Sequence, residues 1–313
     1  MVDIRARPTI RIAIRASIRG ADDVRAGSAT CDAIVGVGAT AEAAGLDAMF
    51  VARSRVLDPY VLLGAIAGTT ERIGLGCLAA PVGERPTAML AKVVTGLDVC
   101  SGGRAVLGIT SEQVERPAAP ALPGRRLLGV QPEASPRDVL LSEALEICRA
   151  MVRVEAPSFT GRAERIVDAW NEPHLNALPI ALLVGARGAP VGHVERGLAL
   201  AARFADVCVV DVGARGPSDR DPDRDAGTAG ADLSDGAWLR ARFAAACLDG
   251  GRPPGELPLL ALCSPPAGGA LSVAALVGRW GAFVDGVIVD IDPVALGADR
   301  CAELIGAIGT PAS

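Results

Sequence analysis

Two polar segments that directly follow apolar runs carry side chains able to hold a ligand or move a proton. Arg53 ends the apolar run at 47–53, and Glu112 comes two residues after the run at 104–110. A guanidinium stays charged and can bind an anion, whereas a carboxyl group shielded from water has a raised pKa and can act as an acid. We therefore expect Arg53 and Glu112 to be candidate catalytic residues.

Cysteine and histidine are placed in a way that does not indicate a metal centre. The eight cysteines are spread singly with no CxxC pair, and only His174 and His193 could complete a zinc site. We expect such cysteines to be small buried side chains with free thiols, in a reducing compartment. We expect no bound metal.

Composition narrows the class of protein. The chain has 313 residues, half of them hydrophobic, and its 31 basic residues are scattered among 36 acidic ones for a net charge of −5. No basic stripe is present, so we expect no nucleic-acid partner. No apolar run reaches the roughly 18 residues of a membrane span, and the start of the chain lacks the apolar core of a signal peptide. We expect a cytoplasmic protein with one domain over 1–313 and a small-molecule substrate.

Short apolar runs recur along the chain and must position these side chains. The eight runs lie at 10–17, 47–53, 72–82, 104–110, 178–185, 206–213, 257–264 and 284–291. They are continuously apolar, as parallel strands covered on both faces are. Amphipathic helices alternate with them, and two of these helices open with Asp-Pro pairs at Asp58 and Asp292, where the aspartate suits the cap.

Eight strand–helix units predict an α/β fold, a (β/α)₈ TIM barrel. A doubly wound open sheet is the alternative, but the count of eight and the lack of GxGxxG after the first run favour the barrel. The segments at 111–136 and 213–235 are insertions after strands four and six. The predicted strand ends share one face and are Ser17, Arg53, Ala79, Thr110, Gly185, Asp211, Ser264 and Asp290.

The stretch "LDVCSGGRAVLGIT" (97–110) joins a helix to the fourth strand. Ser101-Gly102-Gly103 is expected to end the helix, with glycine free to take the left-handed cap conformation. Arg104 then begins the strand at the bottom of the barrel, and Thr110 emerges at the top, where barrel enzymes keep their chemistry.

With these segments, the sequence resembles the bacterial luciferase-like monooxygenases, and within them the branch that uses the deazaflavin coenzyme F420. The resemblance covers about two thirds of the chain in family order, and its most specific part is the helix–SGGR–strand join. Its other main segments are "AEAAGLDAMFVA" (41–52), "DPYVLLGAIAGTTERIGLG" (58–76) and "LPIALLVGARG" (178–188).

The resemblance implies a cofactor phosphate site after the fifth strand. The matching residues are Gly185, Ala186, Arg187 and Gly188. Small residues there would expose backbone N–H groups before a helix N-terminus, and Arg187 would add a charge contact.

The resemblance also implies the surroundings of the cofactor ring. F420-using relatives have a non-prolyl cis peptide that bulges against the back of the ring, and its match here is Leu78–Ala79. Thr110 and Ser111 would contact the pyrimidine edge of the ring, because buried ring carbonyl and N–H groups need hydrogen-bond partners.

The chain departs from the family pattern near the reactive ring carbon. Where relatives have an acid and a histidine after the second strand, this chain has Arg53 and Ser54, which become candidate catalytic residues with Glu112. Three explanations stay open. Glu112, Asp211 or Arg53 handles the proton, or the substrate needs no acid from the enzyme, or the cofactor site has been lost.

The resemblance thus implies hydride transfer between F420 and a small organic substrate, in a protein that we expect to be a homodimer. One alternative is a monooxygenase of the same family that uses FMN. Another is a barrel without redox activity, which the missing histidine and the aromatic content of only 3% favour.

Overall fold

Eight parallel strands close into a barrel in sequence order. The computed structural model describes residues 12–17, 27–54, 57–110, 137–175, 177–185, 189, 191–213, 235–264 and 280–309. Around the barrel the pairing runs β1–β2–β3–β5–β8–β9–β10–β11 and returns to β1. The strands are β1 Ile12–Ala16, β2 Ala48–Val51, β3 Gly74–Cys77, β5 Ala105–Thr110, β8 Ile180–Leu183, β9 Val207–Gly213, β10 Leu259–Cys263 and β11 Gly286–Ile291. The predicted TIM barrel is confirmed.

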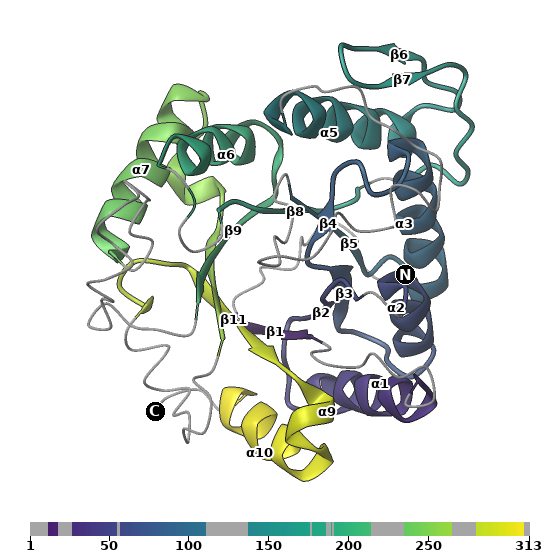
Figure 1. Cartoon of the computed structure of the whole chain (residues 1–313), viewed down its shortest axis with the longest axis vertical. Helices are drawn as coiled ribbons and strands as arrows, with labels where there is room; N and C mark the ends of the chain where they lie inside the picture. Colours follow the sequence, from purple (N-terminus) through teal and green to yellow (C-terminus); the bar gives the residue numbers. More distant parts are fainter. Residues whose placement is uncertain are drawn as a thin grey trace, which may run out of the picture.

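Helices surround the barrel, as Figure 1 shows. They are α1 Gly27–Ala43, α2 Pro59–Ala67, α3 Thr87–Ser101, α5 Arg137–Arg153, α6 Val191–Phe204, α7 Gly236–Asp249, α9 Pro293–Leu296 and α10 Ala298–Gly309, with a short 3₁₀ turn η2 at Pro254–Glu256. Both predicted aspartate caps are present, since Asp58 accepts a hydrogen bond from the Tyr60 N–H and Asp292 accepts from Val294 and Ala295. None of the helices in the described part of the chain is both long and apolar enough to cross a membrane.

The strands separate two apolar cores. The larger one lies between the strands and the surrounding helices. The smaller one fills the barrel interior with Ala13, Ala48, Phe50, Leu78, Ala79, Val106, Ala181, Leu183, Val207, Val209, Leu260, Leu262 and Ile288. Because side chains alternate along a strand, a residue two positions beyond one of these interior residues also points into the barrel.

The SGGR join behaves as its residues predict. Gly102 takes a left-handed conformation (φ 68°), and the Gly103 N–H donates to the Asp98 carbonyl at 2.8 Å. The Arg104 guanidinium then donates five hydrogen bonds of 2.7 to 3.1 Å, to the carbonyls of Ser101, Ala67 and Ile73 and to both Thr70 oxygens. Arg104 therefore fastens the end of α3 to the α2–β3 turn at the bottom of the barrel.

A small antiparallel hairpin lies outside the helical ring, beside α5 (Figure 1). It pairs β6 (Phe159–Thr160) with β7 (Arg165–Ile166). The carboxylate of Glu143 on α5 accepts the N–H groups of Arg162, Ala163 and Glu164 at 2.7, 2.9 and 2.8 Å. Glu143 thus holds the hairpin turn against α5.

Candidate functional site

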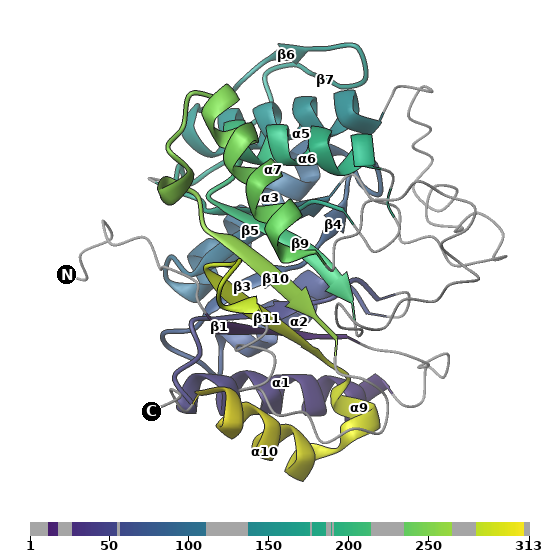
Figure 2. The same cartoon turned by 90° about the vertical axis from the view of Figure 1, so that its left-hand side faces the viewer.

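The carboxyl-terminal ends of the strands meet at one end of the barrel, which we call the mouth. Figure 2 shows the barrel from the side, with the arrows of β9 and β10 pointing toward this end. Active sites of TIM-barrel enzymes lie at this face. All eight predicted strand ends lie within the last three residues of these parallel strands or just beyond them, so they share the mouth.

The third strand is interrupted at the mouth by a bulge. After β3 the chain resumes as β4 (Ala80–Pro81), which also pairs with β5. Gly76 is opposite Val106 and Ala80 is opposite Ile109, so three residues of the third strand lie opposite two of β5. The Leu78–Ala79 peptide is cis, as the resemblance implied.

Gly108 makes room for this bulge. A Cβ atom on Gly108 would lie 1.8 Å from the Cys77 carbonyl oxygen, closer than any side chain can approach. The bulge is directed inward, because Leu78 and Ala79 both belong to the interior core. One wall of the mouth is therefore apolar and is formed by Leu78 and Ala79.

Charged groups occupy the opposite wall. Arg15 and Asp290 are register partners on β1 and β11, two residues beyond the interior residues Ala13 and Ile288. The Arg15 Nε donates to Asp290 Oδ1 at 2.9 Å, and the two side chains are 14% and 0% exposed. The Ser264 hydroxyl, from the end of β10, donates to the other carboxylate oxygen at 3.4 Å.

Asp211 adds a second carboxylate to this wall. It lies two residues beyond the interior residue Val209 on β9, and its Oδ1 accepts the Gly213 N–H at 2.9 Å. Burial alone would lower the pKa of Arg15, but the hydrogen bond and charge of Asp290, together with the charge of Asp211, raise it. Arg15 is therefore a permanent cation inside the mouth.

Thr110 and Gly185 lie between the two walls, at the ends of β5 and β8. The buried Thr110 hydroxyl donates to the Leu183 carbonyl at 3.0 Å, which links the ends of the two neighbouring strands. Gly185 has φ 74°, a conformation that glycine adopts without strain, and its carbonyl accepts the Asp211 N–H at 3.3 Å. Gly185 is the last described residue before the segment where the phosphate is expected.

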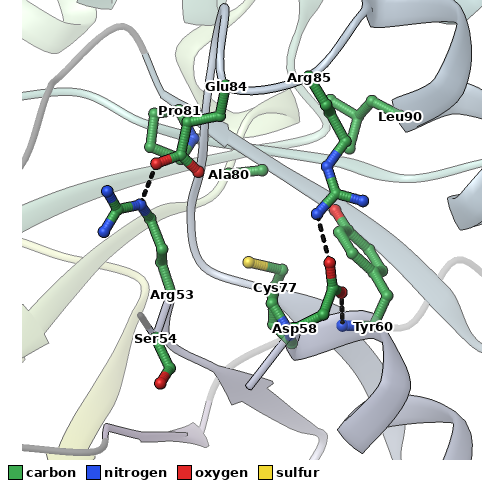
Figure 3. A pocket seen from close by; sticks show the side chains of 11 residues that line it. Arg53, Ser54, Asp58, Tyr60, Cys77, Ala80, Pro81, Glu84, Arg85 and Leu90 are labelled. Carbon is green, nitrogen blue, oxygen red and sulfur yellow. Dashed lines mark hydrogen bonds and ion pairs between the residues drawn. The ribbon is translucent and has the colours of Figure 1, made fainter. Parts of the chain in front are cut away.

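Arg53 and Ser54 lie beside the mouth and line a small cavity between the strand ends, α2 and α3 (Figure 3). Arg53 donates to Glu84, and Arg85 donates to Asp58 at 2.6 Å, so both arginines are paired. The Ser54 hydroxyl accepts the Leu57 N–H at 3.4 Å. The cavity volume is about 80 Å³, far below the several hundred Å³ of ligand pockets, so a ring cofactor does not fit in it.

The thiol of Cys77 points between the two ion pairs of this cavity (Figure 3). Burial raises the pKa of Cys77 to about 12. The thiol is therefore protonated at neutral pH and is a poor nucleophile.

Five predicted site residues lie outside the described residues: Ser111, Glu112, Ala186, Arg187 and Gly188. The predicted insertion at 111–136 lies outside them as well, and that at 213–235 does so apart from its two end residues. Leu78, Ala79, Thr110 and Gly185 are brought together at the mouth, whereas Arg53 and Ser54 face the small cavity beside it.

The ion pair of Arg15 and Asp290 was not predicted from the sequence. Both residues stand inside apolar runs, "IRIAIRAS" and "VDGVIVDI". A charged residue within a run that is otherwise buried on both faces is the signal that could have identified them, because such a charge must be paired.

Comparisons with known proteins identify the family. Residues 10–219 match the family model described as luciferase-like monooxygenase. Uncharacterized proteins of Mycobacterium tuberculosis and Mycobacterium bovis are 32% identical over 157 residues. The match spans 49% of this chain and about half the length of each of these relatives.

Solved structures with a similar fold cover nearly the whole chain. An F420-dependent secondary alcohol dehydrogenase in complex with an F420–acetone adduct has a TM-score of 0.66 at 14% identity, over 96% of this chain and 99% of that one. A coenzyme F420-dependent tetrahydromethanopterin reductase from Methanopyrus kandleri has a TM-score of 0.65 at 15% identity, and a monooxygenase from Streptomyces bottropensis one of 0.64 at 13%. Each of the last two covers 96% of this chain and 97% of its own.

Proposed function

We propose that this chain, which belongs to the luciferase-like monooxygenase family, is an oxidoreductase. It transfers a hydride between F420 and a small organic substrate. The observation that carries this proposal is the two-sided mouth. The apolar bulge at Leu78–Ala79 faces a wall formed by Arg15, Asp290, Ser264 and Asp211. A flat ring with an apolar face against the bulge and a reactive face toward polar groups matches this arrangement.

The residues present fit such a cofactor in shape and in donor chemistry. Gly108 allows the bulge to exist, and the bulge supplies an apolar surface. We assign Thr110, whose hydroxyl lies at the mouth end of β5 and donates to Leu183, to the pyrimidine edge of the ring. The positive φ of Gly185 leads the chain into Ala186, Arg187 and Gly188, on which we place the phosphate.

When bound, F420 would supply the hydride-accepting or hydride-donating ring carbon. The protein would orient the ring and the substrate and exclude water. We assign proton transfer to Glu112, which follows the buried Thr110 by two residues. Arg53 is engaged with Glu84, so we assign it and Ser54 to shaping the rim of the mouth rather than to proton transfer.

A monooxygenase that uses FMN is the second candidate. The family description names monooxygenases, and the Streptomyces bottropensis monooxygenase is nearly as similar in fold as the F420-dependent enzymes. FMN also presents a flat ring and a phosphate, so the same mouth would hold it.

We further propose that the protein is a cytoplasmic homodimer.

Replacing Gly185 with valine tests the proposed phosphate site. Valine at φ 74° would displace the backbone that leads into residues 186–188, so affinity for F420 should fall at least tenfold. Gly251→Val is the matched control, because Gly251 has φ 71° but lies in the turn after α7, before β10 begins. Binding would be measured by fluorescence titration. Equal affinities in the two variants would place the phosphate elsewhere.

A further inference from the structure

We propose that the small cavity beside the mouth is a second binding site, which takes one uncharged molecule of about four heavy atoms with a carbonyl or hydroxyl oxygen. Cys77 and Ala80, which flank the bulge, line this cavity and belong to the core between the strands and the helices. Leu78 and Ala79 belong instead to the barrel interior. The cavity is therefore separate from the site proposed for F420, and the inference does not depend on that proposal.

The hydroxyl group of Tyr60 indicates that a partner is missing from this cavity. Tyr60 lines the cavity and is only 7% exposed, and its hydroxyl oxygen is buried without a hydrogen-bond partner among the described residues. Burial raises the pKa of Tyr60 well above its ordinary value of 10.0, so the hydroxyl keeps its hydrogen at neutral pH. Leaving a buried hydroxyl unpaired costs free energy, and most such groups in folded proteins are hydrogen-bonded. A bound molecule with an oxygen acceptor would supply the partner.

Arg85 adds N–H donors beside this hydroxyl. Its guanidinium lies over the Tyr60 ring, 5.3 Å from the ring centroid, and both side chains line the cavity (Figure 3). A guanidinium has five N–H donors, and among the described residues only one Nη of Arg85 has an acceptor, Asp58. The donors of Arg85 and Tyr60 therefore favour a ligand that carries an acceptor.

The volume of the cavity limits the size of the ligand. The volume is about 80 Å³. A cavity of about 150 Å³ holds benzene, which has six heavy atoms, so this cavity holds a molecule of about four.

The ion pairs of the cavity favour an uncharged ligand. Arg53 is paired with Glu84, and Arg85 is paired with Asp58. A buried anion loses its hydration, and neither arginine is an unpaired cation that would offset this loss. A neutral carbonyl or hydroxyl oxygen accepts N–H and O–H groups without that cost.

Tyr60 is the only tyrosine of the chain, so it can report on the cavity directly. The full chain would be labelled with tyrosine that carries ¹³C at Cζ, which gives one resonance, and titrated with acetamide, acetate and benzamide. Acetamide has four heavy atoms and no charge, and it should shift the resonance saturably. We expect a dissociation constant in the millimolar range, because so small a molecule makes few contacts. Acetate has the same size but a charge and should bind at least tenfold more weakly, and benzamide is too large and should cause no shift.

Three variants test whether the probe binds inside the cavity. Cys77→Met extends a side chain into the space between the two ion pairs and should abolish the acetamide shift (Figure 3). Cys100→Met makes the same change at an exposed thiol on α3 and should leave the shift intact. Tyr60→Phe removes only a hydroxyl that has no partner among the described residues, so the fold should survive. In ligand-observed NMR titrations its acetamide affinity should be about fivefold lower than that of the wild type.

The inference would be overturned by the absence of a saturable shift with acetamide, by equal affinities for acetamide and acetate, or by a shift that persists in Cys77→Met. Unchanged acetamide affinity in Tyr60→Phe would overturn it as well. Since F420 is absent from all these measurements, their failure is separate from a failure of the proposed function.

Discussion

At the scale of single residues, buried charges organise both the mouth and the periphery of the barrel. Glu143 is the peripheral case, since one carboxylate accepts three consecutive backbone N–H groups of the hairpin turn. Burial would raise the pKa of Glu143, but these hydrogen bonds outweigh it and lower the pKa below its ordinary value of 4.5. The ionised carboxylate is therefore the form that holds the hairpin.

Glu143→Gln should destabilise the protein at neutral pH by about 1–3 kcal/mol, because the amide nitrogen of glutamine cannot accept these N–H groups. With a lowered folded-state pKa, the contribution of Glu143 is complete above pH 4.5 and is lost as the pH falls through the lower value. The difference from the wild type, measured by urea unfolding, should shrink below pH 4.5. Glu146→Gln on the same helix, which loses only a surface ion pair of 3.3 Å, should change stability by less than about 1 kcal/mol. Equal losses in the two variants at neutral pH would contradict this role.

Sequence patterns identify residues whose partners are local and miss those whose partners are distant. Asp58 and Asp292 cap helices that begin at the next residue, so the Asp-Pro pairs were sufficient to predict them. Glu143 binds a turn about twenty residues away, and Arg15 pairs with Asp290 across 275 positions. Only closure of the barrel, which pairs the first strand with the last, brings Arg15 and Asp290 together.

At the scale of elements, the bulge between β3 and β4 depends on the neighbouring strand. The extra residue is accommodated because Gly108 on β5 allows the Cys77 carbonyl to approach. The apolar wall of the mouth is thus a product of two strands, and one glycine decides its shape.

Gly108→Ala should disrupt this bulge. The added Cβ would lie 1.8 Å from a backbone oxygen, so the expected destabilisation is about 2–3 kcal/mol, in the range of overpacked cores, with weaker F420 binding. Gly96→Ala on the exposed side of α3 is the control. Nothing lies within 4 Å of its added Cβ, so it should stabilise the protein by about 0.5–1 kcal/mol. Thermal or urea unfolding would measure both, and a neutral Gly108→Ala would show that the bulge is adaptable.

The elements themselves were largely predictable from continuous apolar runs, since each of the eight barrel strands lies inside its predicted range. The helix expected from Asp292 onward is instead two helices, because Gly297 (φ 76°) separates α9 from α10. The β6–β7 hairpin has strands of two residues, too short to carry a pattern. The positions of Glu112 and of residues 186–188 remain predictions.

At the scale of the whole molecule, the two ends of the barrel differ in how their polar side chains are used. The bottom is fastened by Arg104, all of whose donors are used within the protein. The mouth combines an apolar bulge with a charged wall that retains free donors on Arg15 among the described residues. Stability at one end and binding capacity at the other are typical of TIM-barrel enzymes, and the family match over residues 10–219 agrees with that division.

Comparative titration of the purified full chain with F420 and with FMN, each in oxidised and reduced form, tests the central claim most directly. The account predicts saturable binding of F420, at least tenfold tighter than that of FMN, and weakening of F420 binding by Gly185→Val. Tighter binding of FMN would favour the monooxygenase. Binding of neither cofactor at high micromolar concentration would contradict the proposed oxidoreductase.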